Sequence, residues 1–143
     1  MSGRETSYEV IKWIEYAEND YKLARFILYG EYSPKPYNTI CNLCQQSAEK
    51  AVKALILSFG MTNGLPRSHD IRFLLNQITN ILRSEKNIII TDEINLIAAT
   101  LSEYAAETRY PTDDEITDGE AALCVGYTEK MLLWVKNIIE IQE

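Results

Sequence analysis

The chain has 143 residues, 46% of them hydrophobic, and this length and composition predict one domain, residues 1–143, around one core. Its net charge of -7 disfavours general binding to DNA or to an anionic membrane, so a phosphate site would need a local basic patch. The apolar runs are far shorter than the roughly 20 residues that cross a bilayer, and the N-terminus lacks a signal-peptide pattern, so we expect a cytoplasmic protein.

The first predicted helix runs from about Glu5 to Tyr29 and ends at Gly30. Its apolar side chains recur at the three- and four-residue spacing of an amphipathic helix: Val10, Trp13, Ile14, Ala17, Tyr21, Ala24, Ile27 and Leu28. Asp20 lies on the flank of this stripe, where a carboxylate is costly unless a cation or a hydrogen-bond donor meets it. It is either a partly exposed residue at the bundle edge or a partner for Lys50 or Arg109.

The second predicted helix runs from about Tyr37 to Phe59, between a proline-rich loop and the break at Gly60. At about 100° per residue, its apolar side chains lie within about 60° of Ala48 and should face the core. They are Cys41, Cys44, Ala51, Val52, Leu55 and Phe59. The polar side chains lie about 100 to 200° away, and they are Gln46, Glu49, Lys50 and Lys53. This polar side is either a solvated surface with a Glu49–Lys53 pair or one wall of a cleft or dimer seam.

Cys41 and Cys44 form a CxxC pair inside the apolar side of this helix. A zinc site needs about four ligands, and only Cys124 and His69 remain to complete one. We therefore predict core packing for these cysteines, with metal or redox chemistry as the alternative. No metal and no cofactor are expected.

Ser68 is typical of an N-cap, with His69 and Asp70 in the first turn of a third helix. Apolar residues follow at helical spacing: Ile71, Leu74, Leu75, Ile78, Ile81 and Leu82. Arg67, His69 and the free amides of a helix start would form an anion site. The alternative is that His69 hydrogen-bonds a neighbouring backbone group.

Residues 88–90 are three isoleucines, which we interpret as an apolar loop because no other stretch offers a partner strand. Thr91 caps a fourth helix, and Pro111 ends it. The buried face of that helix is Ile94, Ile97, Ala98, Leu101, Tyr104 and Ala105. Thr117 and Glu120 fit a capping box, from which a fifth helix runs nearly to the last residue. The pattern predicts an all-α antiparallel up-and-down bundle of four to five helices with a left-handed twist.

Four fragments combine into a pattern that covers nearly the whole chain. They are Trp13-Ile14-Glu15-Tyr16-Ala17-Glu18-Asn19-Asp20-Tyr21 with Ala24, Gln46-Ser47-Ala48-Glu49-Lys50-Ala51-Val52-Lys53-Ala54-Leu55, Ser68-His69-Asp70-Ile71 with Leu74-Leu75, and Tyr104 with Arg109-Tyr110-Pro111. In this order they resemble the HEPN domain family. The resemblance implies a helical bundle that pairs as a homodimer, similar to the substrate-binding partners of small nucleotidyltransferases. It also implies a relation to metal-independent endoribonucleases and toxins, and to members proposed to bind nucleotides.

The ribonuclease branches of that family use an Arg followed, after four to six residues, by a His. In this chain the corresponding positions after Arg109 hold Asp114, Glu115 and Ile116, and the single histidine is His69. The sequence therefore departs from the catalytic pattern.

We expect a nucleotide- or partner-binding module that works with a small nucleotidyltransferase and has no catalysis of its own. The predicted site combines side chains from several helices, namely Asp20, Gln46, Glu49, Lys50, Lys53, His69, Tyr104, Arg109 and Tyr110. Lys50, Lys53 and Arg109 would contact the phosphate of a nucleotide or RNA, and Tyr104 or Tyr110 would offer a stacking surface. The alternative is a metal-independent endoribonuclease, in which His69 takes the 2′-OH proton and Arg109 stabilises the developing charge.

Overall fold

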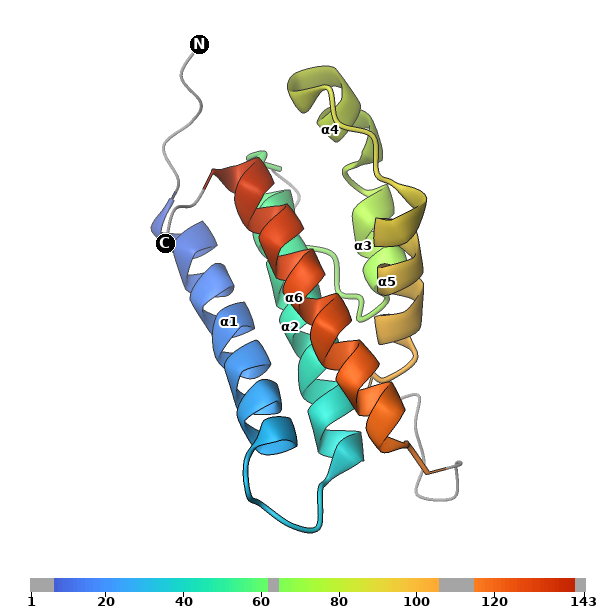
Figure 1. Ribbon diagram of the computed structural model, residues 1–143. Coiled ribbons are helices and arrows are strands. Elements are labelled where there is room, and N and C mark those ends of the chain that lie inside the picture. The colour runs from blue at the N-terminus through green and yellow to red at the C-terminus, as the bar shows by residue number, and fades with distance from the viewer. Residues whose placement is uncertain (1–6, 62–64, 106–114, 141–143) are drawn as a thin grey trace.

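The computed structural model describes residues 7–61, 65–105 and 115–140, and over these ranges it contains six helices and no strand. Helices α1 (Tyr8–Tyr29), α2 (Tyr37–Ser58) and α6 (Asp118–Ile139) are 22 residues each and lie side by side. In Figure 1, α1 and α5 (Asp92–Ser102) run in one direction and α2 and α6 in the opposite direction, with α5 beside α6. The predicted all-α helical bundle is confirmed.

Helix α2 occupies the centre of the bundle, because it packs against α1, α6, α3 and α5. The side predicted to be apolar is buried along its whole length. Its residues Cys41, Cys44, Ala48, Ala51, Val52 and Leu55 are each 0% exposed, and Phe59 is 6% exposed. The helical periodicity of the sequence therefore identified the core face of α2 correctly.

The first helix begins at Tyr8, three residues later than predicted. The hydroxyl group of Ser7 accepts a hydrogen bond from the Val10 amide at 3.2 Å, which makes Ser7 the N-cap. Gly30 ends α1 as predicted. None of the helices in the described ranges is long and apolar enough to cross a membrane.

The predicted third helix is two helices, α3 (Ile71–Asn76) and α4 (Thr79–Lys86). The hydroxyl group of Thr79 donates to the Leu75 carbonyl at 3.1 Å. The Leu75 carbonyl also accepts from the Ile78 amide at 3.1 Å, so the backbone forms a tighter turn here than in an α-helix. Gln77 and Ile78 separate the two helices, and α4 extends beyond α3 at one end of the molecule (Figure 1).

The N-cap of α3 is Asp70 rather than Ser68. The Asp70 carboxylate accepts from the Arg72 amide at 3.0 Å, while the Ser68 hydroxyl accepts from the Asp70 amide at 3.1 Å. His69 therefore precedes the helix, and the predicted first turn was two residues too early.

Helix α5 starts after Thr91, as predicted, and ends at Ser102, before the predicted end near Arg109. The Ser102 hydroxyl donates to the Ala98 carbonyl at 2.7 Å and accepts from the Ile71 amide at 3.0 Å, which ties the end of α5 to the start of α3. Residues 88–90 form the predicted apolar loop. Thr117 caps α6 as predicted, through a 3.1 Å hydrogen bond from the Glu120 amide.

Candidate functional site

The polar side of α2 carries a nearly buried carboxylate, Glu49, which is 8% exposed. Its Oε1 accepts hydrogen bonds from Gln45 Nε2 at 2.9 Å and from His69 Nδ1 at 2.8 Å. Its Oε2 accepts from Lys53 Nζ at 2.8 Å. Glu49 thus brings together two predicted site residues, Lys53 and His69, and one that was not predicted, Gln45.

The Glu49 carboxylate is held in its ionised form. Burial alone raises the pKa of this carboxyl group, but the hydrogen bonds from Lys53, Gln45 and His69 outweigh burial and lower the pKa below its ordinary value. At neutral pH the cluster therefore contains an anion inside a ring of donors.

His69 lies at the surface end of this cluster. Its side chain is 61% exposed, although Nδ1 is bound to Glu49. Gln45 Nε2 also donates to the His69 backbone carbonyl at 3.1 Å, so α2 fixes both the backbone and the ring of this residue. Because the carboxylate is an acceptor, it favours the ring tautomer with hydrogen on Nδ1. The structure gives the His69 ring a side-chain partner, the Glu49 carboxylate.

Asp20 on α1 pairs with Lys50 on α2 at 2.6 Å, which is one of the two partners predicted for it. Farther along the same two helices, Lys53 Nζ lies 5.9 Å from the centre of the Trp13 ring. Helix α1 and the segment before α3 thus cover the polar side of α2. The Glu49–Lys53 pair of the first alternative is present, but Glu49 is buried rather than solvated, and both lysines are engaged by carboxylates.

Gln46 and Tyr104 belong to a neighbouring cluster. The Gln46 amide hydrogen-bonds Asn42, whose Nδ2 donates to the Tyr104 carbonyl at 3.2 Å. The Tyr104 hydroxyl donates to Glu120 at 2.9 Å; burial and this hydrogen bond raise the pKa of Tyr104. The remaining two predicted site residues, Arg109 and Tyr110, lie outside the described residues.

Gln45 was missed because it lies about 60° from Ala48 on the helical wheel, at the edge of the core face. It is 2% exposed. Its spacing of four residues from Glu49 was the available signal, since side chains at that spacing meet on a helix.

The three cysteines are buried free thiols, as the core-packing prediction required. Burial raises the pKa of Cys44 to about 12, so this thiol is neutral at physiological pH. Among the described residues, no group of three or more His, Cys, Asp or Glu side chains is placed to hold a metal ion.

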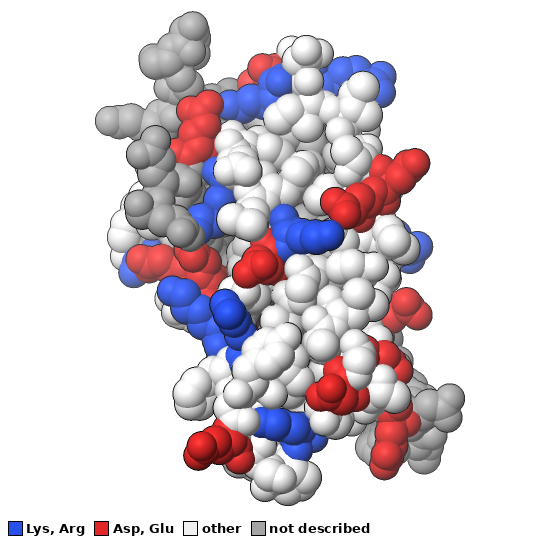
Figure 2. Space-filling view, in the orientation of Figure 1, with Lys and Arg blue, Asp and Glu red and all other residues white. Residues whose placement is uncertain are grey.

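The face of the molecule shown in Figure 2 has acidic and basic side chains interspersed rather than one large patch of either sign. A basic surface broad enough to follow a nucleic-acid backbone is therefore absent from this view of the described chain. Binding of an anion would depend on a few local cations.

A sequence model of the HEPN domain matches residues 10–138 of this chain. The structure of TT1696 from Thermus thermophilus resembles it with a TM-score of 0.73 and 24% identity, over 92% of this chain and 98% of that chain. The structure of ST0689, an archaeal HEPN homologue, resembles it with a TM-score of 0.69 and 29% identity, over 97% of this chain and 99% of that chain. No curated protein sequence matches the chain significantly.

Proposed function

The chain belongs to the HEPN domain family, and we propose that it is a nucleotide- or partner-binding module that works with a small nucleotidyltransferase and has no catalysis of its own. The observation that carries this proposal is the cluster around Glu49, in which a buried carboxylate holds the exposed His69 ring. The cluster presents one polar ring at the surface in a fixed orientation.

A buried ionic cluster is a costly way to stabilise a helix pair, because apolar side chains of similar volume often do so at least as well. The geometry supports a positioning role instead. Gln45 and Glu49 together bind the backbone carbonyl and the ring nitrogen of His69. Arg67, two residues earlier, is exposed and supplies a cation beside it. In this proposal His69 and Arg67 contact an anionic ligand, while Lys50 and Lys53 hold Asp20 and Glu49.

Calorimetric titration of ATP, other nucleotides and a short RNA tests the ligand. Wild-type protein is expected to bind one of them, and His69→Ala to bind it about tenfold more weakly, the effect of losing one charge-assisted hydrogen bond. The matched control is Arg83→Ala, which removes a cation from exposed α4. Equal binding by wild type and His69→Ala would contradict the role of His69.

The partner has its own test. A small nucleotidyltransferase encoded beside this chain would support the paired-module interpretation, and the two proteins should then co-purify after joint expression. We also propose a homodimer, for which light scattering after gel filtration should give twice the 16.4 kDa chain mass. A monomer that fails to bind such a neighbour would contradict both proposals.

A second candidate function is a metal-independent endoribonuclease that uses His69 and Arg109. The 2.8 Å contact between Glu49 and His69 Nδ1 favours it, since a carboxylate in this position fixes the tautomer of a catalytic histidine and leaves Nε2 as the basic nitrogen. Purified protein should then cleave RNA in the presence of EDTA. Activity that persists in both His69→Ala and Arg109→Ala would exclude those roles.

A further inference from the structure

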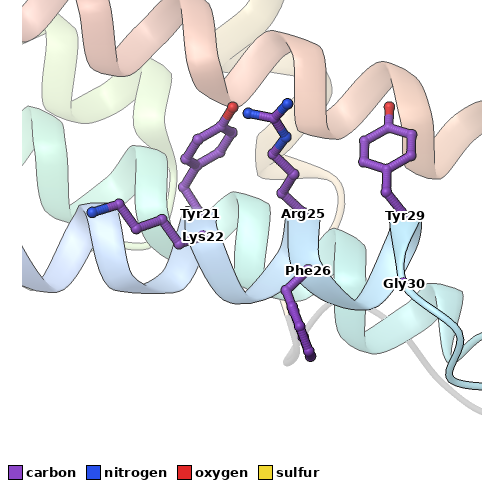
Figure 3. A pocket seen from close by; sticks show the side chains of 6 residues that line it. All are labelled: Tyr21, Lys22, Arg25, Phe26, Tyr29 and Gly30. Atoms are coloured by element: carbon purple, nitrogen blue, oxygen red, sulfur yellow. The ribbon is translucent and has the colours of Figure 1, made fainter.

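The C-terminal half of α1 borders an open depression of about 440 Å³. Its lining residues are Tyr21, Lys22, Arg25, Phe26, Tyr29 and Gly30. Tyr21, Arg25 and Tyr29 are four residues apart, so they form one column along the helix. Figure 3 shows the three side chains pointing toward α6, with the Arg25 guanidinium between the two phenol rings, whereas Phe26 points the other way.

The cations of this depression differ from those elsewhere on the long helices. Five cations on α1, α2 and α6 pair with carboxylates, and these are Lys12, Lys50, Lys53, Lys130 and Lys136. The other two, Lys22 and Arg25, both line the depression and form no ion pair within the described ranges. In a chain of net charge -7, a ligand anion can meet these two cations without displacing a carboxylate.

An acidic group of α6 near one end of the depression is already engaged. Glu129 of α6 accepts a hydrogen bond from the Tyr21 hydroxyl at 2.8 Å, and Figure 3 shows the Arg25 guanidinium beside that hydroxyl. Tyr21 therefore stands between Glu129 and Arg25 and links the two helices at one end of the depression. At the other end Tyr29 is 65% exposed.

From these features we propose that the depression binds a nucleoside phosphate. Arg25 and Lys22 bind the phosphate group, because a guanidinium fork suits phosphate oxygens and the ammonium adds a second charge. The Tyr29 ring stacks on the base, as aromatic side chains do in sites for unpaired nucleotides. A volume of about 440 Å³ lies within the usual range of small-molecule sites, about 300 to 1,000 Å³, and suits one nucleotide rather than an extended strand.

This site is distinct from the His69 site and does not depend on it. Asp20, which contacts α2, and Arg25 are five residues apart, so they lie about 140° apart around α1. The depression therefore lies on a different side of α1 from its contact with α2, and each site can be disabled without touching the other.

Amide-resolved NMR titrations with AMP, adenosine and inorganic phosphate test the proposal on the full chain. AMP should shift the amides of residues 21–30 and bind more tightly than either of its parts. Arg25→Gln should weaken AMP binding about tenfold, and Tyr29→Leu should remove the advantage of AMP over phosphate. The matched controls on the same helix are Lys12→Gln and Tyr16→Leu, since Tyr16 is also exposed, at 55%. Both controls should bind like wild type.

Three results would overturn the proposal: no AMP-dependent shift in residues 21–30, equal losses in Arg25→Gln and Lys12→Gln, or binding of a single-stranded RNA or acidic peptide without binding of AMP. The variant His69→Ala separates the two sites. It should leave AMP binding at residues 21–30 unchanged, whether or not the His69 site binds a ligand.

Discussion

Replacing Glu49 with Gln should destabilise the protein at neutral pH, and the size of the effect follows from the three hydrogen bonds to the carboxylate. Gln has one acceptor oxygen and one NH₂ group. If the oxygen faces Gln45 and His69, the NH₂ group faces the Lys53 ammonium; in the reverse orientation, it faces the two other donors. Either way at least one hydrogen bond to a charged group is lost, which lowers the free energy of unfolding by about 1.5 to 3 kcal/mol.

The effect should depend on pH. Because the pKa of Glu49 is lowered from its ordinary value of 4.5, the ionised carboxylate stabilises the folded state above pH 4.5, and this stabilisation is lost as the pH falls through the lower pKa of the folded state. Protonated Glu49 then resembles Gln, so the difference between wild type and Glu49→Gln should shrink in acid.

Urea denaturation monitored by circular dichroism measures both the loss of unfolding free energy and its dependence on pH. The matched control is Glu93→Gln, which removes an exposed partner of Lys130, and it should change stability by less than about 1 kcal/mol. The reasoning fails if Glu49→Gln is as stable as wild type at pH 7, or if its deficit is the same at pH 7 and in acid.

Three further predictions concern other parts of the fold. Gly30→Ala should lower the free energy of unfolding by about 1 to 3 kcal/mol in a urea titration, because the new Cβ would lie 2.5 Å from the Phe26 carbonyl oxygen; a variant as stable as wild type would contradict this contact. Thr117→Ala should lower the free energy of unfolding, measured by thermal melting, by about 1 kcal/mol because the Glu120 amide loses its hydrogen bond to the N-cap of α6. Thr117→Ser keeps a hydroxyl group and should retain most of the stability. Burial raises the pKa of Cys44 to about 12, so the native protein should leave a thiol reagent unreacted at pH 8 and urea-unfolded protein should react; rapid native labelling of Cys44 would refute this.

The long helices could be predicted because their burial follows the helical period. The apolar side of α2 repeats for six turns without interruption, so no knowledge of its neighbours was needed to place it in the core. The split between α3 and α4 lacks such a signal. Ile78 and Leu82 are both buried, as one continuous helix would also require, and the break is a local turn in which the Gln77 and Ile78 amides donate to carbonyls three residues back.

Contacts within the candidate site could be predicted where two residues lie one turn apart on a helix, or where a carboxylate needed a cation. Lys53 and Glu49 are four residues apart, and Asp20 needed a cation, for which Lys50 was one of two choices. The contact of Gln45 with His69 was not predictable, because the His69 carbonyl that it binds comes from a segment 24 residues away. Such contacts depend on how the segment before α3 packs against α2, and sequence spacing carries no direct record of that.

The pairing of charges also decides which cations a ligand can use. A phosphate that approaches Lys50 must compete with Asp20, which holds the ammonium group at 2.6 Å and would itself lose a cation if it were displaced. The same holds for Lys53 and Glu49. A phosphate that approaches Arg25 displaces no carboxylate among the described residues. Lys50 is therefore better suited to joining α2 to α1, and Lys53 to holding Glu49, and an anionic ligand should bind where the cations lack a carboxylate partner.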